Sequence, residues 1–286
     1  MSPDQYCQQK AAASGSSFYY SFLFLPPERR RAITALSAFC REVDDAVDEA
    51  SDAQRAAVKL AWWRAELANL GAGRPQHPVA KALLPFMETF SISTDRLGEI
   101  IDGMEMDLTQ TRYLDWAGLE RYCYRVAGVV GILAAGIFGY RDARTLDYAR
   151  RLGIAFQLTN IIRDVGEDAR KNRIYLPMED LKAHGVPASD ILQGRETDAF
   201  RALMRFEAER AKLVNGHDGI LDAAVQRHVI PCARRVAGAV VVKAQHMVAA
   251  LGEDFLLLLR IPRVPDHPQV RTVGRQPAAQ QGAGRH

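Results

Sequence analysis

The stretch RLGIAFQLTNIIRDVGEDARKNRIYLP at residues 151–177 carries a polar stripe along an otherwise apolar helix. The stripe consists of Gln157, Asn160, Asp164 and Asp168, which follow one another at intervals of three, four and four residues. At 3.6 residues per turn these side chains fall within about 80° of the helix circumference and extend along about 16 Å of its axis. Buried amides and carboxylates require polar partners, because leaving them bare costs several kcal/mol. The pattern predicts either a polar site on this helix or a polar seam where it meets another helix.

A second acidic feature is the run REVDDAVDE at residues 41–49. On a helix Asp44 and Asp48 stand one above the other, about 40° apart. Arg41 lies one turn before Asp44 and Asp45. An isolated run of this kind is most often a solvated face with local ion pairs. Apolar residues before and within the run weaken that interpretation here, so the run is a second candidate site.

The fold class that the sequence favours is all-α, because alternating β-branched runs bounded by turns are scarce. We expect one domain of packed, mostly antiparallel helices within residues 1–260. The expected helices cover residues 28–50, 52–70, 77–90, 94–107, 115–140, 143–168 and 198–215. Residues 261–286 are rich in Pro, Gly, Gln and Arg, a composition that predicts a disordered tail.

Composition excludes several classes of protein. The 286 residues include 37 basic and 34 acidic side chains, a net charge of +3, so no nucleic-acid partner is indicated. No sequence segment reaches the roughly 18–20 consecutive apolar residues of a membrane span, and the N-terminus lacks the apolar centre of a signal peptide. The four cysteines are far apart and form no CxxC pair, which favours a cytoplasmic protein with reduced thiols.

Several catalytic motifs are absent from the sequence. It contains no GxxxxGK[ST] phosphate loop, no GxGxxG dinucleotide motif, no GxSxG elbow and no HExxH zinc motif. Nucleotide-dependent, nicotinamide-dependent, serine-hydrolase and zinc chemistries are therefore not indicated.

The two oxygen-rich stripes on separate helices predict sites for hard cations. Mg²⁺ takes oxygen ligands and is usually held by one or two carboxylates together with substrate phosphates. Two such sites facing each other would bind a diphosphate through metal bridges. The neighbouring cations Arg41, Arg163, Lys171 and Arg173 suit phosphate oxygens, although ordinary ion pairing on helix surfaces is an equal alternative. A calcium-binding helical bundle is a weaker alternative, since the sequence has no EF-hand loop.

Three segments resemble the signatures of the squalene and phytoene synthases. They are SGSSFYYSFLFLPPERRRAITALSAFCREVDDAVDE at residues 14–49, YCYRVAGVVG at residues 122–131, and QLTNIIRDVGEDARKNRIYLP at residues 157–177. The resemblance runs from about Tyr6 to Asp190 and weakens after about residue 230. It implies an isoprenoid-synthase-like helical bundle with a central cavity.

The resemblance also implies roles for individual residues. Metal binding falls to Asp44, Asp48, Asn160, Asp164 and Asp168, with support from Asp45 and Glu167. Diphosphate binding falls to Arg41, Gln157, Arg163, Lys171, Arg173 and Tyr175, and Asp45 is counted with the substrate site. Ser17 and Phe18 match a segment that caps the substrate, and Tyr122, Ala127 and Gly131 match residues that line the cavity. Tyr122 and the released diphosphate are both candidates for the proton acceptor.

The reaction that the resemblance implies is the head-to-head joining of two prenyl diphosphates with Mg²⁺. Within the family, residues 16–33 and 103–123 most resemble the bacterial hopanoid-pathway branch, which converts two farnesyl diphosphates into presqualene diphosphate. No NADPH is expected. The alternatives are phytoene synthesis from geranylgeranyl diphosphate and a non-catalytic family member, although such a member would be expected to lose its acidic ligands.

Features around the expected cavity remain open to two interpretations. The small residues Gly128, Gly131 and Gly136 would leave room for two lipid chains or permit close helix packing. Ser37 stands where relatives usually have Tyr, which predicts a gap or a missing hydroxyl contact. Beyond about Pro231 the family pattern departs, with Val240 near an expected Tyr.

Contacts with a membrane and with downstream pathway enzymes are further expectations. Arg29, Arg30 and Arg31 beside Phe22 and Phe24 could attract anionic headgroups at the inner membrane face. A solvated helix start explains the same residues equally well.

Overall fold

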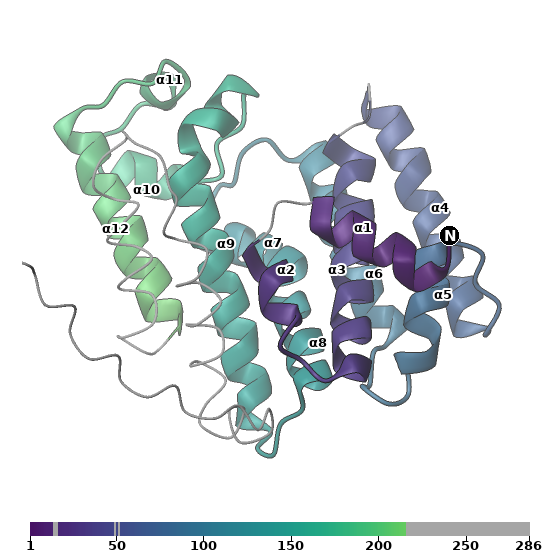
Figure 1. The fold of residues 1–286 in the computed structure, drawn as a ribbon. Helices are drawn as coiled ribbons and strands as arrows, with labels where there is room; N and C mark the ends of the chain where they lie inside the picture. The colour runs from purple at the N-terminus through teal and green to yellow at the C-terminus, as the bar shows by residue number, and fades with distance from the viewer. Residues whose placement is uncertain (14–16, 49, 51, 216–286) are drawn as a thin grey trace, which may run out of the picture.

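The computed structural model describes residues 1–13, 17–48, 50 and 52–215, and in this part of the chain the protein is all-α. The only β-pairing among these residues is an isolated bridge between Arg112 and Ile174. The helices, shown in Figure 1, are α1(Pro3–Ala13), α2(Ser17–Phe22), α3(Pro27–Asp48), α4(Ala53–Gly71), α5(Pro78–Leu83), η1(Leu84–Phe86), α6(Thr94–Thr109), α7(Trp116–Cys123), η2(Tyr124–Gly128), α8(Val129–Phe138), α9(Arg144–Arg170), α10(Met178–Ala183), α11(Ala188–Leu192) and α12(Asp198–Asn215). The expected tail at residues 261–286 and the departure beyond Pro231 lie outside the described residues.

Local capping explains where several expected helices begin. The Asp52 carboxylate accepts the Arg55 N–H at 2.8 Å before α4, and the Ser93 hydroxyl accepts the Arg96 N–H at 3.2 Å before α6. The expected helix over residues 77–90 is wrong in its length. It ends as α5, and the 3₁₀ turn η1 follows, because Pro85 lacks an N–H for the helical hydrogen bond.

Helix α1 has no strong amphipathic pattern and was not expected from the sequence. It is held by contacts with α3: the Lys10 ammonium lies 3.1 Å from Glu42 and 2.8 Å from Asp45. The Tyr6 hydroxyl also donates to Glu42 at 2.6 Å. The short helices α2, α10 and α11 were likewise not expected, because segments of five or six residues show too little periodicity.

The expected helix over residues 115–140 forms as one continuous stretch, Trp116–Phe138, with a π-helical turn at η2 in its middle. This stretch has the length and apolarity of a membrane span, with a mean hydropathy of 1.3 over its most apolar 18 residues. Its buried residues Leu119, Val129 and Leu133 pack in the protein interior, so the same composition also suits a core helix.

Two hydrophobic clusters form the interior. One joins α1 and α3–α6 to α8 and is centred on residues such as Leu36, Phe39 and Leu97. The other joins α7 and α9–α12 through residues such as Leu158 and Leu203. Figure 1 shows these halves side by side, with the long helix α9 between α12 and the N-terminal helices.

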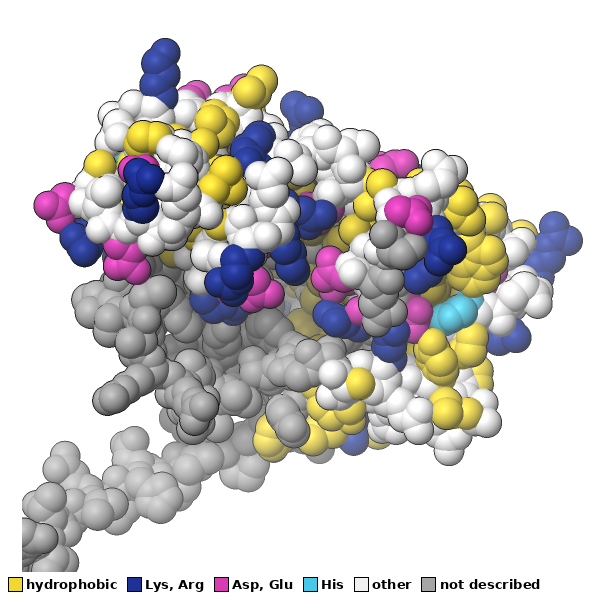
Figure 2. All heavy atoms as spheres, turned by 90° about the horizontal axis from the view of Figure 1, so that it is seen from above, with side chains coloured by type: hydrophobic (Ala, Val, Ile, Leu, Met, Phe, Trp, Pro, Cys, Tyr) yellow, Lys and Arg dark blue, Asp and Glu magenta, His cyan; other side chains and the backbone are white. Residues whose placement is uncertain are grey.

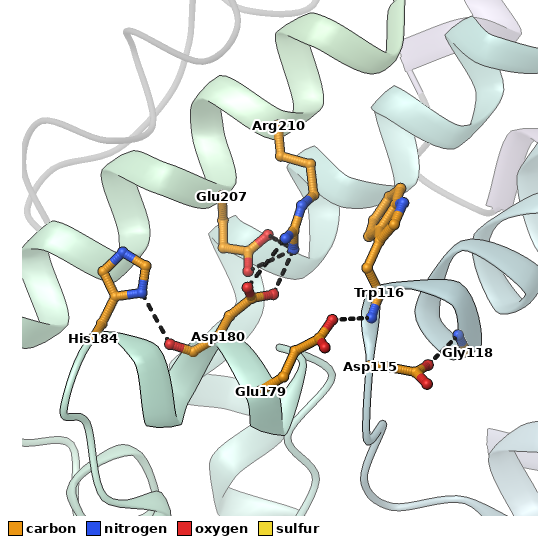
Figure 3. A network of polar contacts seen from close by, with 8 residues as sticks. All are labelled: Asp115, Trp116, Gly118, Glu179, Asp180, His184, Glu207 and Arg210. Carbon is orange, nitrogen blue, oxygen red and sulfur yellow. Dashed lines mark hydrogen bonds and ion pairs between the residues drawn. The ribbon is translucent and has the colours of Figure 1, made fainter.

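A buried charged cluster ties α12 to α10, as shown in Figure 3. The Arg210 guanidinium lies 2.7 Å from the Asp180 carboxylate and 2.9 Å from the Glu207 carboxylate, and it stacks over the Trp116 ring. Burial raises the pKa of Glu207 to about 7; Arg210 opposes this shift and Asp180 adds to it. One guanidinium thus faces two buried carboxylates, which favours a proton on this pair.

We predict that Arg210→Ala lowers the free energy of unfolding by about 3–5 kcal/mol, because two buried carboxylates lose their counter-charge. Glu207→Gln should behave differently. The pKa of Glu207 is raised in the folded protein, so the free energy of unfolding of the wild type falls as the pH rises towards about 7 and Glu207 loses its proton. The amide side chain of the variant does not titrate, so its stability lacks this dependence on pH.

Thermal unfolding between about pH 5 and 8 measures both effects. The melting temperature of Glu207→Gln relative to wild type should rise with pH, and a difference that falls with pH would contradict the assignment.

Candidate active site

A cavity of about 290 Å³ lies between α3, α9 and the η2–α8 stretch. Its walls are almost entirely apolar, and its polar side chains are those of Ser37, Gln157 and Asn160. The other lining residues are Phe22, Ile33, Leu36, Cys40, Val126, Ala127, Val130, Gly131, Ala134, Ala135, Phe138, Ala149, Leu152, Gly153 and Phe156. A cavity of the kind that the resemblance implies is therefore present, and Ser37, Ala127 and Gly131 lie in its wall.

Both acidic features lie beyond the same end of this cavity. In Figure 1, α3 and α9 both run upward, so their acidic C-terminal halves lie at the top of the view. On α3, Asp44 follows the lining residue Cys40 by one turn, and on α9, Asp164 follows Asn160 by one turn. Figure 2 looks down on this end and shows basic and acidic side chains gathered over the middle of the face.

The acidic pair on α3 consists of Asp44 and Asp48, and Asp44 is partly neutralised by Arg41 of the same helix. Arg41 donates to Asp44 at 2.9 Å and lies 2.8 Å from Asp45. Burial raises the pKa of Asp44 to about 6, and the neighbouring charge of Asp48 adds to the rise while Arg41 opposes it. Asp45 is buried against Arg41 and Lys10, so it braces α3 against α1, whereas Asp48 is exposed.

The acidic pair on α9 has a matching arrangement. Arg163 makes a two-pronged contact with Asp164, at 2.7 and 2.6 Å. Burial raises the pKa of Asp168 to about 6, with a further contribution from Asp164, while Lys171 and Arg173 oppose the rise.

Other residues with expected roles lie on α9, directly after it, or on α2. Asn160 donates to Gln157 at 3.4 Å, and Lys171 lies 3.9 Å from Glu167. Ser17 and Phe18 begin α2, whose last residue, Phe22, lines the cavity.

Asp107 on α6 is a site residue that the sequence reasoning missed. Its carboxylate accepts the hydroxyl of Tyr122 at 3.0 Å and that of Tyr175 at 2.8 Å. Its backbone carbonyl accepts Arg173 at 2.9 Å. The available signal was its register: Asp107 follows Ile100 and Gly103 at intervals of three and four residues, on the buried face of α6, whereas Asp102 and Glu105 are not buried.

Tyr122 is placed differently from the expectation. It is not among the residues that line the cavity, and its buried hydroxyl donates to Asp107. Burial and the Asp107 charge raise its pKa well above the usual value for a tyrosine. The residue therefore stays a neutral hydrogen-bond donor in this arrangement, which is unfavourable for a proton acceptor.

Of the three glycines that the sequence left open to two interpretations, Gly131 is among the residues that line the cavity, whereas Gly128 and Gly136 are not. Gly131 lines the cavity, and a Cβ built on it would lie 2.3 Å from the Ala149 carbonyl of α9. A Cβ on Gly153 of α9 would lie 2.3 Å from the Ala127 carbonyl in return. The backbones of the two helices are thus in direct contact at Gly131 and Gly153, both of which line the cavity.

We predict that Gly153→Ala lowers the free energy of unfolding by about 3 kcal/mol, because the added methyl group meets a backbone carbonyl that cannot move aside. Gly166→Ala on the same helix is the matched control. A Cβ there meets nothing within 4 Å, so the change should raise stability by about 1 kcal/mol through helix propensity. Chemical denaturation measures both, and equal effects would contradict the close helix contact.

The carboxylates at the charged end of the cavity, Asp44 and Asp48 on α3 and Asp164 and Asp168 on α9, are ligands that suit a hard divalent cation. Among the described residues, no three His, Cys, Asp or Glu side chains converge on one point. The acids instead stand in pairs one turn apart, and the raised pKa values of Asp44 and Asp168, due first to burial, show carboxylates that a cation would stabilise. Paired carboxylates that need further oxygen ligands suit Mg²⁺ held jointly with phosphate.

The sequence model of the squalene/phytoene synthase family matches residues 11–265. A 15-cis-phytoene synthase from Synechocystis is 39% identical over 218 residues, which cover 72% of this chain and 65% of the relative. Phytoene synthase 3 from Zea mays is 39% identical over 212 residues, covering 72% of this chain and 50% of the relative. The chain thus spans between half and two thirds of the length of these curated relatives.

Solved structures show the same fold. A dehydrosqualene synthase has a TM-score of 0.73 and 26% identity, covering 90% of this chain and 96% of its own. Squalene synthase HpnC from Alicyclobacillus acidocaldarius has a TM-score of 0.69 and 27% identity, covering 90% and 93%. The fold is therefore that of the isoprenoid-synthase-like helical proteins. The chain belongs to the squalene/phytoene synthase family, whose members act on prenyl diphosphates.

Proposed function

We propose that this protein joins two molecules of farnesyl diphosphate head to head to give presqualene diphosphate. The observation that carries the proposal is the cavity itself, an apolar chamber with two carboxylate pairs and their arginines beyond one end. Prenyl chains suit the apolar walls, and diphosphates suit the charged end. Mg²⁺ would be held by Asp44 and Asp48 on α3 and by Asn160, Asp164 and Asp168 on α9. When bound, it would act as a Lewis acid and neutralise the charge of the leaving diphosphate.

The arginines beside these carboxylates would change partners on substrate binding. Arg41 and Arg163 now bind Asp44 and Asp164, and a diphosphate would compete for both guanidinium groups. Lys171, Arg173 and Tyr175 lie at the start of the segment after α9, within reach of the same charged end. Their role is to bind and orient the diphosphate and to stabilise the charge that develops on it.

The proposed chemistry begins with cleavage of the C1–O bond of one farnesyl diphosphate, whose electron pair leaves with the diphosphate. The resulting allylic cation is attacked by a double bond of the second chain, and loss of a proton closes the cyclopropane ring. The dry walls of the cavity protect the cation from water. Since the Tyr122 hydroxyl already donates to Asp107, the released diphosphate is the better proton acceptor of the two candidates.

Phytoene synthesis from geranylgeranyl diphosphate is the second candidate, because the curated relatives quoted above are phytoene synthases. The farnesyl substrate is supported by the resemblance of residues 16–33 and 103–123 to the presqualene-forming branch. It is also supported by two solved relatives of nearly full coverage, which are named as squalene and dehydrosqualene synthases.

We predict that the purified full chain, given Mg²⁺ and farnesyl diphosphate without NADPH, releases presqualene diphosphate. Geranylgeranyl diphosphate supplied in parallel should react more slowly, and chromatography with mass spectrometry of the lipids measures both products. Preferred formation of prephytoene diphosphate or phytoene would establish the second candidate, and no turnover of either substrate would contradict both.

Two variants test the metal-binding assignment in the same assay. Asp48→Asn and Asp164→Asn should each lower turnover at least about 100-fold, because the leaving charge loses stabilisation, while the melting temperature changes little. Asp198→Asn is the control, since this carboxylate is exposed on α12. Unchanged rates for the first two variants would remove these carboxylates from the site.

The proposal includes peripheral contact with the inner face of a membrane by a cytoplasmic protein, where downstream enzymes would receive the lipid product. Supporting it, Leu23 and Phe24 in the turn before α3 are 46% and 72% exposed, and they adjoin the cavity residue Phe22. The neighbouring arginines are partly engaged: Arg29 donates to the Phe138 carbonyl, and Arg30 to that of Leu25.

We predict that the protein sediments with vesicles containing phosphatidylglycerol, and that Leu23→Ser with Phe24→Ser weakens this binding severalfold by removing exposed apolar area. Leu114→Ser changes a residue that is 79% exposed, more than either Leu23 or Phe24, in another loop, and it should leave binding unchanged. Equal binding by all three proteins would contradict membrane contact through this turn.

A further inference from the structure

Asp107 lies on α6 and links this helix to the segment that follows α9. Each carboxylate oxygen accepts one tyrosine hydroxyl, Oδ2 that of Tyr122 at 3.0 Å and Oδ1 that of Tyr175 at 2.8 Å. The backbone oxygen accepts Nη2 of Arg173 at 2.9 Å. A single residue therefore organises three polar groups, two of which belong to the strand-like segment at residues 173–175.

The carboxylate of Asp107 and the guanidinium of Arg173 form an ion pair without a direct hydrogen bond between them. Nη1 of Arg173 lies 3.9 Å from the Asp107 carboxylate, too far for a hydrogen bond, and donates instead to the Tyr175 hydroxyl at 3.3 Å. The same guanidinium opposes the burial-driven rise in the pKa of Asp168, so its field reaches the acidic pair on α9. Asp107 thus orients Arg173 through its backbone oxygen, while its carboxylate forms a longer ion pair with the same guanidinium.

The charge of Asp107 also acts on the acidic pair on α3, Asp44 and Asp48. The raised pKa of Asp44 is due first to burial and then to nearby charges that include Asp107. The pKa of Asp107 is likewise raised, first by burial, with a contribution from Asp48. The charges of Asp107 and Arg173 therefore act on the two candidate metal pairs, and Arg173 and Tyr175 line one small pocket together with Asp168.

The surroundings of Asp107 keep it in place. Gly103, one turn earlier on α6, lies where a Cβ would be 2.7 Å from the Val126 side chain, so α6 approaches η2 closely. The rings of Tyr122 and Tyr175 stack with their centroids 5.3 Å apart. This packing restricts the rotamers of both tyrosines and holds their hydroxyls against the carboxylate.

We propose that Asp107 is a positioning residue for diphosphate binding, which holds Arg173 and the Tyr175 hydroxyl beside the acidic pair on α9. The inference rests on the proposed function, since it deepens the account of the same site. A buried acid with a purely structural role would instead affect folding without affecting the affinity for diphosphate. The two cases are separable by experiment.

The test is calorimetric binding of inorganic diphosphate with Mg²⁺ to the full chain. Asp107→Asn keeps the shape but offers one acceptor oxygen for two hydroxyls, so the affinity should fall about tenfold, the usual effect of losing a supporting contact. Asp107→Glu should recover part of this loss. Asp180→Asn is the matched control, because Asp180 is as deeply buried as Asp107 but pairs with Arg210 instead of Arg173. This substitution should lower the melting temperature and leave the affinity for diphosphate unchanged.

A double-mutant cycle identifies the pathway of the effect. Arg173→Met should weaken binding, and adding Asp107→Asn should weaken it little further, because Asp107 acts through Arg173. Losses that multiply fully would overturn the positioning role, as would unchanged affinity in Asp107→Asn. If Asp107→Asn does not fold, Tyr175→Phe removes only the hydroxyl between Asp107 and Arg173 and should give the same loss of affinity.

The outcome is independent of turnover. If wild type binds diphosphate but converts no prenyl substrate, the proposed reaction fails and the role of Asp107 is still measured. If wild type binds no diphosphate in the presence of Mg²⁺, the inference is overturned, since Asp107 then positions nothing for that ligand.

Discussion

The site depends on one contact, the backbone-to-backbone approach of α9 to the helix that runs from Trp116 to Phe138. Gly131 and Gly153 make this approach possible, because any side chain at either position would meet the carbonyl of the opposite helix. The two helices then form a thin wall along the cavity. On α9 the same wall ends in the polar residues Gln157 and Asn160, which lead to the acidic pair at Asp164 and Asp168.

At the charged end of the cavity, burial disfavours the ionised carboxylates and nearby basic side chains favour them. Burial and repulsion from neighbouring acids raise the pKa values of Asp44 and Asp168. Arg41 on the same helix offsets part of the rise for Asp44, and Lys171 and Arg173, which follow α9, do so for Asp168. A protein selected only for stability would replace these acids. Carboxylates with raised pKa values beside an apolar cavity are typical of functional sites, where local stability is often lower than a purely structural region would have.

Most of the helices could be predicted because long amphipathic or apolar segments are specified locally. The start of α4 at Asp52 and that of α6 at Ser93 follow from side-chain caps that are readable in the sequence. The break at Pro85 was readable too and was missed. Helix α1 could not be predicted, because its position depends on Lys10 and Tyr6 meeting Glu42, a residue more than 30 positions away.

The sequence by itself determined the helical class, the family resemblance and the two acidic stripes, since a repeat of three or four residues places side chains on one helix face. Only the tertiary structure decided what those faces meet. It placed Ser37 and Gly131 on one cavity, turned Tyr122 towards Asp107, and made Asp107 part of the site. Helical periodicity is a local property of the backbone, whereas the partner of a buried hydroxyl or carboxylate depends on which distant helix packs against it.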